Sequence, residues 1–499
     1  MTVQTTVGGA QDEELMGLFT VEELREVISV KVLAGQDSLS GKRQIRQIAT
    51  DSRSIRRGDL FVALRGEQFD GHDFVPAALA QGAAGAIVHD EYRLPPSSAA
   101  VRRIAGRPAP FLFGVRDPLF AYQQLATHHR SRFNIPVVAV TGSNGKTTTK
   151  EMVAAVLAQR WPVLKTEGNF NNRIGVPYTL FRLTTRHQAA VIEMGVDQQG
   201  QTTRLCEIVR PTIGLITNIG PDHLEFFGSM EGSAQAKAEM LDMLPAEGTV
   251  ILNADDPYFD YLAARALCRV MSFGFSEMAD VRASGVTSDV RQGTSFRLHL
   301  PGKTRPANAR IKVHGTHNVT NALAAAAVGA ALNLSGSMIV QGLGRFRPAA
   351  MRSQVVTHHG VHIINDCYNA NPASMKAALQ LLAQWSPARE RIAVVGDMLE
   401  LGTETRSMHR EVGQFLATQG LSRLIVCGAL GRDIAEGARQ GGMAGSQIEE
   451  LGDAGAAADR LKKIVRQGDV VLVKASRGMK MEQVVQVLTG MRAVVKQAS

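Results

Sequence analysis

The stretch that decides the fold runs from residue 137 to residue 149: Val137-Val138-Ala139-Val140-Thr141-Gly142-Ser143-Asn144-Gly145-Lys146-Thr147-Thr148-Thr149. Its continuous β-branched start predicts a buried parallel strand, and the apolar spacing after it predicts a helix. A glycine loop between such a strand and helix is typical of phosphate-binding sites, because backbone N–H groups and the helix N-terminus converge on one anion. Val140 stands where the strict P-loop pattern has its first glycine.

The loop predicts a nucleotide site with a metal ion. Lys146 is expected to reach the terminal phosphates, and the Thr147 hydroxyl is expected to hold Mg²⁺. The residues that we expect to bind the nucleotide here are Thr141, Gly142, Ser143, Asn144, Gly145, Lys146, Thr147 and Thr148. Glu193 directly follows the apolar run 189–192, so it is placed to supply the acidic metal ligand. His223 follows another buried strand, and from the local sequence a structural role is as well supported as a catalytic one.

Outward from this stretch, strands and helices alternate along the chain. Its 499 residues, of which 44% are hydrophobic, suffice for about three cores. We expect an α/β protein with a small α/β domain, a central P-loop parallel sheet and a C-terminal Rossmann-like domain. The expected segments are a flexible N-terminus at 1–16 and domains at 17–114, 115–346 and 347–499, with a strand at 59–64, a helix at 74–81 and a helix at 118–132.

Composition narrows the class of protein. The net charge of +9 comes from dispersed basic residues without a Lys or Arg run, and aromatic residues make up only 5%, so a nucleic-acid partner is not expected. The four cysteines form no paired motif, which indicates a reducing compartment. Neither a signal peptide nor an apolar stretch of the ~18 residues that span a membrane is visible, so we expect a soluble cytoplasmic protein.

The phosphate-loop segment resembles that of the Mur ligases and the folylpolyglutamate synthetases. Further segments match this family in order along almost the whole chain: GNFNNRIGVP (168–177), EMG (193–195), HLEFFGS (223–229), AKAE (236–239), NADD (253–256) and GTHNVTNALAA (315–325). Within the family, the chain also shows a resemblance to the branch that adds D-alanyl-D-alanine to a UDP-linked muramoyl tripeptide. The segments that carry it are TDSRSIRRGDLFVALRGEQFDGHDF (50–74), NDCYNANPASM (365–375), GDMLELG (396–402) and VKASR (473–477).

The resemblance implies a reaction. ATP activates the tripeptide carboxylate as an acyl phosphate, which the amine of D-alanyl-D-alanine then attacks. Thr147 and Glu193 would hold one Mg²⁺, and His223 would hold a second with Lys237 carrying a carbamate formed from CO₂. Arg352 of the third domain would stabilise the transferring phosphoryl group. Because Met351 replaces the glycine that usually precedes this arginine, Arg345 and Arg347 stay open as alternatives.

The resemblance also implies substrate contacts. His317 and Asn318 would contact adenine, and Asp366 the ribose. Residues matched to the UDP-sugar peptide are Ser52, Arg53, Gly71, His72, Asn169, Asn172 and Arg173, and those matched to the dipeptide are Tyr368, Asn369 and Asn371. Several of these also suit ordinary turns or a helix start.

Some alternatives remain open from the sequence. The third tripeptide residue is either lysine or diaminopimelate, and rival functions are another Mur-type ligase or a P-loop protein switched by nucleotide. We expect a monomer that closes its third domain on the second, with a hinge near 342–348, where two glycines lie.

Overall fold

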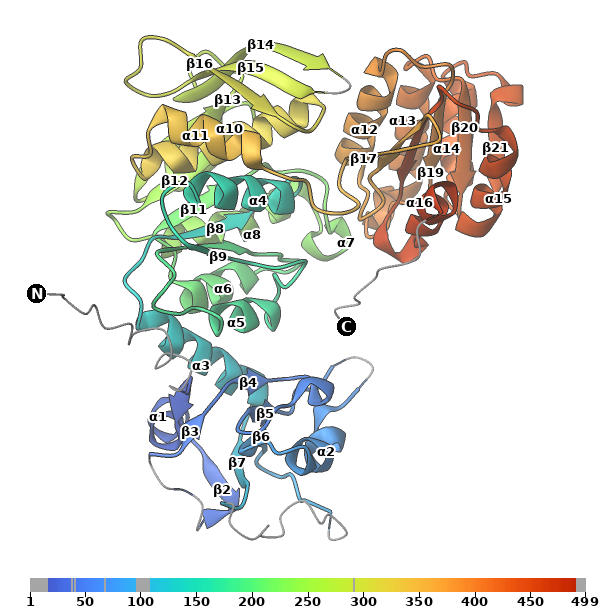
Figure 1. Cartoon of the computed structure of the whole chain (residues 1–499). Helices are drawn as coiled ribbons and strands as arrows, with labels where there is room; N and C mark the ends of the chain where they lie inside the picture. Colours follow the sequence, from blue (N-terminus) through green and yellow to red (C-terminus); the bar gives the residue numbers. More distant parts are fainter. Residues whose placement is uncertain are drawn as a thin grey trace, which may run out of the picture. The chain divides into compact units, whose positions relative to one another are not determined.

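The computed structural model describes residues 17–36, 39, 42–66, 69–95, 108–289 and 292–490, so the N-terminal stretch 1–16 lies outside the described residues. The chain folds into two compact units (Figure 1). The first contains Met1–Asn134, Arg173–Thr185 and Glu207–Val209, and the second contains the rest. Three larger sheets, one in the first unit and two in the second, match the three α/β segments expected from the sequence.

The first unit is built on a five-stranded sheet in the order β2-β7-β6-β5-β4. Its strands are β2 (Lys31–Ala34), β4 (Ile48–Ala49), β5 (Leu60–Val62), β6 (Gly85–His89) and β7 (Phe111–Val115), parallel except for β2. Further elements are the strand pair β1 (Phe19–Thr20) and β3 (Gln44–Ile45) and the helices α1 (Val21–Val27), α2 (Val75–Ala80), α3 (Pro118–Ser131) and α5 (Gly175–Leu180). The strand and the helix expected at 59–64 and 74–81 are confirmed as β5 and α2.

Helix α3 groups with the first unit by its contacts. The sequence pattern places it at the start of the central segment, and that boundary stays a prediction. Tyr122 and His129 of α3 pack with Phe19 and Phe181 of the first unit. These aromatic partners are distant in sequence, so the local pattern does not indicate these contacts.

The central sheet of the second unit has nine strands in the order β16-β15-β14-β13-β12-β11-β8-β10-β9. They are β8 (Val137–Thr141), β9 (Val163–Lys165), β10 (Ala189–Glu193), β11 (Ile213–Ile216), β12 (Thr249–Asn253), β13 (Arg269–Gly274), β14 (Val281–Asp289), β15 (Gly293–His299) and β16 (Ala307–Ile311). The parallel sheet expected here is confirmed from β9 to β14, whereas β14, β15 and β16 pair antiparallel.

Helices α4 (Lys146–Leu157), α10 (Thr316–Ala331) and α11 (Gly336–Arg345) contact one another and share a core with this sheet. Small residues permit the close approach: a Cβ on Gly342 would lie 2.5 Å from the Cα of Val156. Gly342 and Gly344 are therefore helical residues of α11, and Phe346 is buried in the same core. Of the residues expected at the hinge, 342–348, only those after Phe346 leave the helix and its core, and hinge motion there stays a prediction.

Other helices of the second unit are α6 (Gln201–Val209, whose last three residues group with the first unit), α7 (Leu224–Phe227), α8 (Met230–Met243) and α9 (Phe259–Arg265). The C-terminal sheet runs β17-β18-β22-β19-β20-β21, parallel except for β17. Its strands are β17 (Gln354–His358), β18 (Val361–Asn365), β19 (Arg391–Val395), β20 (Arg423–Cys427), β21 (Ile448–Leu451) and β22 (Val470–Lys474).

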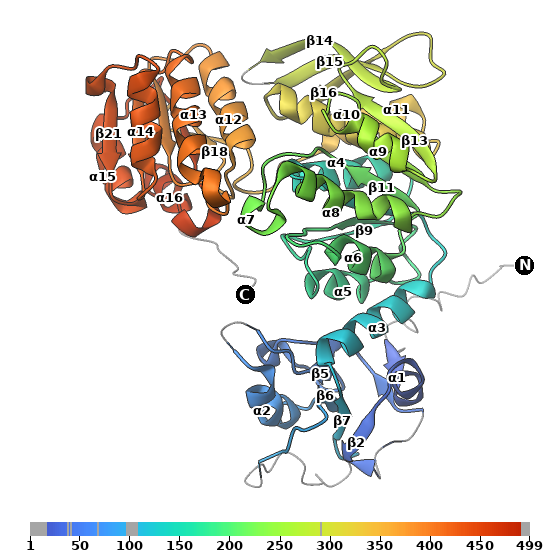
Figure 2. The same ribbon diagram turned by 180° about the vertical axis from the view of Figure 1, so that it is seen from behind.

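Helices cover both faces of this C-terminal sheet (Figure 2). Helices α12 (Pro372–Gln384), α13 (Thr405–Ala417) and α14 (Gly431–Gln440) share one core with it. Helices α15 (Ala454–Ile464) and α16 (Glu482–Thr489) share the other. Two cores on one parallel sheet confirm the Rossmann-like architecture. The domain boundaries at 114/115 and 346/347 remain predictions.

Candidate functional site

The loop after β8 has the geometry of an anion cradle. Gly142 and Gly145 adopt left-handed backbone conformations, with φ of 130° and 79°. A Cβ on Gly142 would collide with the Thr217 side chain, and one on Gly145 with Asn321. Glycine is therefore required at both positions. Val140, by contrast, is a buried strand residue paired with Glu193 of β10, so the missing first glycine does not alter the curled part of the loop.

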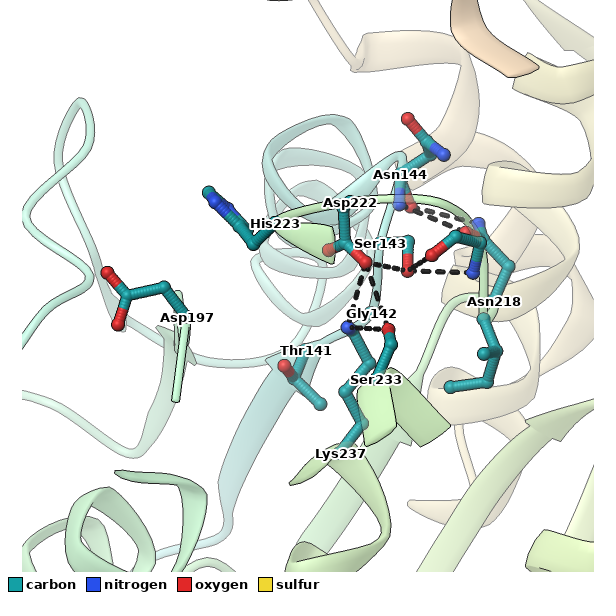
Figure 3. Close-up of polar contacts among 12 residues, drawn as sticks. Thr141, Gly142, Ser143, Asn144, Asp197, Asn218, Asp222, His223, Ser233 and Lys237 are labelled. Atoms are coloured by element: carbon teal, nitrogen blue, oxygen red, sulfur yellow. Dashed lines mark hydrogen bonds and ion pairs between the residues drawn. The ribbon is translucent and has the colours of Figure 1, made fainter. Parts of the chain in front are cut away.

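The chain that follows β11 holds this loop in shape (Figure 3). The backbone N–H of Asn144 donates to Oδ1 of Asn218 at 3.0 Å, and the Thr217 hydroxyl donates to the Asn144 carbonyl at 2.6 Å. The Ser143 N–H donates to the Asn218 carbonyl at 2.9 Å. These bonds leave the helix end open: α4 begins at Lys146 after a glycine N-cap that supplies no side-chain acceptor. Its first N–H groups can therefore bind an anion.

Lys146 lies over its own loop. Its Nζ donates to the carbonyls of Gly142 and Ser143, at 2.6 Å and 3.2 Å. Both acceptors are neutral, so a triphosphate that enters the loop offers the ammonium a stronger partner. This position agrees with the phosphate-binding role predicted for Lys146.

Glu193 ends β10 beside the loop and is almost fully buried. Its Oε1 accepts hydrogen bonds from the Thr147 hydroxyl (3.0 Å) and from Nδ2 of Asn171 (2.9 Å). Its Oε2 has no hydrogen-bond partner among the described residues, although Nζ of the buried Lys150 lies 3.7 Å away. A buried carboxylate oxygen without a hydrogen bond, next to a threonine hydroxyl, fits Mg²⁺, which prefers oxygen ligands.

No group of three or more His, Cys, Asp or Glu side chains that could hold a metal occurs in the described part of the chain. Thr147 and Glu193 together offer two protein ligands. Mg²⁺ commonly takes one or two carboxylates and completes its shell with waters and substrate phosphates. The donor set therefore suits a metal that arrives with a nucleotide.

Lys237 of α8 is 1% exposed and is linked to the loop through Asp222. Its Nζ donates to Oδ1 of Asp222 at 3.0 Å and to the Ser233 hydroxyl at 2.7 Å. The same Asp222 oxygen accepts from the Ser143 hydroxyl at 2.6 Å, so one carboxylate joins the loop to the lysine (Figure 3). Burial lowers the pKa of Lys237 to about 8, although Asp222 opposes this shift. The lysine is therefore a buried amine within reach of its neutral form near physiological pH.

His223 precedes α7 with a left-handed backbone, φ 50°. Its Nδ1 lies 2.6 Å from Oε2 of Glu400, at ion-pair distance but without hydrogen-bond alignment. Glu400 itself has a left-handed backbone, φ 64°. Two strained residues that meet beside a cavity are more typical of a functional site than of a simple scaffold.

At the start of α10, Asn318 is buried and its Nδ2 donates to the His314 carbonyl at 2.7 Å. Burial lowers the pKa of His317, which favours a neutral ring. Asn321, one turn further on, accepts from the Thr149 hydroxyl at 3.1 Å and links this helix to α4. The two residues matched to adenine therefore lie close to the phosphate loop.

On the C-terminal sheet, Oδ1 of Asp366 accepts from the Ser353 N–H at 2.8 Å, and Oδ2 accepts from Nζ of Lys474 at 2.6 Å. Lys474 also donates to the Asn369 carbonyl at 2.9 Å. Asn371 caps α12, as expected for a helix start, and its Nδ2 also donates to Oδ1 of Asn144 at 2.8 Å. A capping residue thus touches the phosphate loop.

A cavity of about 870 Å³ brings these residues together. It is lined by predicted site residues of the central and C-terminal sheets, namely Ser143, Asn144, Gly145, Lys146, Thr147, Thr148, Asn169, Asn172, Glu193, His223, His317, Asn318, Arg352, Asp366, Tyr368, Asn369 and Asn371. Arg345 and Arg347 line a different groove, beside Trp161. Among the three candidate arginines, the geometry therefore favours Arg352.

Met351, which stands where the resemblance leads us to expect glycine, adopts φ 61°. That left-handed conformation is the one glycine adopts without steric cost, which gives the expected glycine a physical reason. The backbone before Arg352 is therefore kept in its special conformation despite the substitution.

The predicted uridine-site residues lie in two short 3-10 helices of the first unit, Ser52–Ser54 and Gly71–Phe74. Asp51 accepts from the Arg53 N–H at 2.9 Å and pairs with its guanidinium at 2.8 Å. His72 lies 2.6 Å from Asp70 through Nδ1, and its Nε2 accepts from the His89 N–H at 2.9 Å. Asp51 and Asp70 cap these two short helices, while uridine binding by Ser52, Arg53, Gly71 and His72 stays a prediction. Arg173 also groups with the first unit.

Several residues that hold the site together were not predicted from the sequence: Lys150, Asn171, Asp222, Asn321 and Lys474. Two had a local signal. Asp222 directly precedes His223, and Lys150 interrupts the apolar face of α4. For the other three, the partners are distant in sequence or the residue type is common.

The described residues include no helix that is long and apolar enough to cross a membrane. Three family models match the chain: "Mur ligase family, catalytic domain" at residues 44–111, "Mur ligase middle domain" at 140–329 and "Mur ligase, glutamate ligase domain" at 351–477. The matches lie in the same order as the three larger sheets.

Relatives extend the likeness over nearly the whole chain. A UDP-N-acetylmuramoyl-tripeptide–D-alanyl-D-alanine ligase from Bacillus subtilis is 36% identical over 88% of this chain and 92% of its own length. The ligase of the same name from Escherichia coli is 36% identical over 93% of this chain and 99% of its own. A MurF structure from Acinetobacter baumannii has a TM-score of 0.83 at 32% identity, covering 95% of this chain and 99% of its own. By its domain models, its relatives and its structure, the chain belongs to the Mur ligase family.

Proposed function

We propose that this chain is an ATP-dependent ligase that joins D-alanyl-D-alanine to UDP-N-acetylmuramoyl-tripeptide in peptidoglycan precursor synthesis. The observation that carries the proposal is the shared cavity, in which the phosphate loop faces Arg352, Asp366 and Tyr368 of the C-terminal sheet. The relatives over most of the chain's length carry the name of this ligase. A MurF ligase from Thermotoga maritima, 27% identical, has been solved in complex with ADP, which supports the use of ATP.

The chemistry requires two anions to meet. The tripeptide carboxylate attacks the γ-phosphorus, the bond from that phosphorus to the bridging oxygen breaks, and ADP leaves. The acyl phosphate is then attacked by the dipeptide amine, which loses a proton as phosphate departs and the amide forms. Cations must outweigh the repulsion in the first step.

We assign these cations to residues of the cavity. Lys146 moves from the loop carbonyls to the terminal phosphates, and the N–H groups of the loop bind the phosphate oxygens. Mg²⁺ bound at Thr147 and Glu193 supplies charge neutralisation when it is present. Arg352 donates to the transferring phosphoryl group from the side of the C-terminal sheet, as an arginine finger does. A second Mg²⁺ at His223 and a carbamylated Lys237 is part of the proposal.

Asn169, Asn172 and Arg173 are proposed to contact the UDP-linked peptide, and Asn369 and Asn371 the dipeptide. His317 and Asn318 are proposed to contact adenine, with Asp366 at the ribose. A reaction that consumes ATP is expected in the cytoplasm, and we propose that the chain acts there as a monomer.

The test is phosphate release from ATP with UDP-N-acetylmuramoyl-tripeptide, with and without D-alanyl-D-alanine. Release should need both substrates, and mass spectrometry should show the pentapeptide product. If the chain instead added lysine or diaminopimelate to a UDP-N-acetylmuramoyl-dipeptide, this result would favour another Mur-type ligase. Slow hydrolysis that ignores every amine would favour a nucleotide-switched binding protein.

A further inference from the structure

Arg352 rests on an aromatic ring. Its guanidinium carbon lies 4.0 Å from the ring centroid of Tyr368, well within the range of a cation–π interaction. Both side chains are half-buried and line the cavity that contains the phosphate loop. Within the described part of the chain, the guanidinium has this ring contact and no ion pair.

The backbone around Arg352 is bent to present it. Met351 and Ser353, its two neighbours, both have left-handed conformations, with φ of 61° and 46°. Such conformations persist in non-glycine residues only where the surroundings enforce them. Two hydrogen bonds enforce them here: the Ser353 N–H donates to Asp366 at 2.8 Å, and the Tyr368 N–H donates to the Met351 carbonyl at 3.2 Å. The loop of Arg352 is thus tied to the segment that carries Tyr368.

The nearby carboxylate does not compete for the arginine. Asp366 already accepts from Ser353 and, at 2.6 Å, from the buried Lys474. An arginine that lies on a ring face keeps its N–H donors in the plane of the guanidinium, where they can meet phosphate oxygens. The ring therefore fixes the direction of the guanidinium without occupying its donors.

We propose that Tyr368 is a positioning residue for Arg352: its ring holds the guanidinium by a cation–π contact in the orientation that phosphoryl transfer needs. This inference rests on the proposed function. It gives Tyr368 a role distinct from the dipeptide contact that the resemblance implies, because the ring acts through Arg352 rather than on the dipeptide.

The first experiment compares Tyr368→Leu with Tyr368→Phe. Loss of the ring should lower kcat about three- to thirty-fold, the range of a partly desolvated cation–π contact. The KM for D-alanyl-D-alanine should change less than about twofold, and Tyr368→Phe should restore most of kcat. In an Arg352→Ala background, Tyr368→Leu should have no further effect on kcat. An equal loss in both backgrounds, or a raised dipeptide KM with normal kcat, overturns the proposal.

Tyr261→Leu is a matched control, since the Tyr261 hydroxyl also contacts an arginine, Arg265, at 3.4 Å, on α9 outside the cavity. Tyr261→Leu should leave kcat unchanged, and it should not alter the loss of kcat caused by Arg352→Ala. A control that loses as much kcat as Tyr368→Leu would show a general effect of tyrosine loss and count against the proposal.

A second series does not depend on Tyr368→Leu folding. Phenylalanine with one, two or three ring fluorines at position 368 keeps the ring shape and weakens the negative ring face stepwise. The logarithm of kcat should fall with each fluorine, and a flat series overturns the proposal. Failure of the proposed function would look different, because the unmodified chain would then form no pentapeptide at all.

Discussion

Nζ of Lys150 lies 3.7 Å from Oε2 of Glu193, and neither side chain has appreciable contact with solvent. Lys150 also donates to the Thr166 carbonyl at 2.7 Å and lies 3.0 Å from Oε1 of Glu151. Glu151 in turn pairs with Lys165. Burial alone would raise the pKa of Glu151, but Lys150 and Lys165 outweigh it and hold that pKa below its usual range.

Lys150→Met should therefore destabilise the fold strongly. The change leaves the buried Glu193 carboxylate without its cation, which costs about 3–5 kcal/mol when one partner of a buried pair is removed. Urea unfolding measures the change. Lys165→Met is the matched control: this lysine is 41% exposed, so its loss should cost about 1 kcal/mol or less. Equal effects of the two variants would contradict the prediction.

Lys146→Ala should lower the rate by about 10²–10⁴ by removing a preorganised charge from the terminal phosphate. The fold should survive, because among the described residues the hydrogen bonds of Nζ go to two carbonyls of its own loop. Coupled phosphate release gives the rate, and circular dichroism gives the melting temperature. A variant with near-normal turnover would remove the phosphate loop from the mechanism.

Lys237→Ala should be nearly inactive, and short carboxylic acids should restore part of the activity by replacing the carbamate oxygens. Lys303→Ala is the control, since this lysine is exposed in a turn, and the same acids should not change its rate. Full activity of Lys237→Ala without added acid would falsify the carbamate assignment.

The amount of carbamate on Lys237 should also increase with pH. Only the neutral amine attacks CO₂, and burial lowers the pKa of Lys237 to about 8. The neutral fraction therefore rises as pH increases through that value. At constant dissolved CO₂, the ¹³C carbamate signal of the apo-protein should increase between about pH 7 and pH 9. A signal that is constant or falls over this range argues against the assignment.

Closure of the C-terminal domain on the central one should compact the chain when an ATP analogue and the UDP-substrate are added together. Small-angle scattering measures this, with each ligand alone as control, and an unchanged radius of gyration would rule closure out.

Gly342→Ala tests whether Gly342 is needed for helix packing rather than for a hinge. Its Cβ would lie 2.5 Å from the Val156 Cα, so the variant should lose about 1–3 kcal/mol of stability.

Local patterns in the sequence were sufficient where one segment carries the whole signal. The strand, the loop and the start of α4 are contiguous, so the local sequence predicted this strand–loop–helix arrangement, while phosphate binding by the loop stays a prediction. Glu193 was predictable because a carboxylate directly after four buried residues must lie at the strand's carboxyl edge. Continuous apolar runs elsewhere in the sequence also predicted parallel strands of both sheets in the second unit, but they did not predict β9, β13 or β21.

The sequence was insufficient where the partner is distant. Asn321 meets Thr149, and Lys474 meets Asp366, across more than a hundred residues. Neither residue type is distinctive alone. The antiparallel strands β14–β16 were missed because β14 alternates buried and exposed positions only in its first half and then becomes polar. The glycines at 342 and 344 suggested a hinge, but tight helix packing requires the first of them.

The burial of Lys237 should also restrict which reagents can reach its amine, according to their size. Lys150 and Lys237 are both enclosed, while Lys146 at the loop is partly accessible. Burial lowers the pKa of the Lys237 amine to about 8, but the side chain is only 1% exposed, so bulky electrophiles cannot approach it. Amine-directed labelling reagents should therefore modify Lys146 before Lys150 and Lys237, whereas the proposed carbamate requires only that CO₂, a small linear molecule, reaches Lys237.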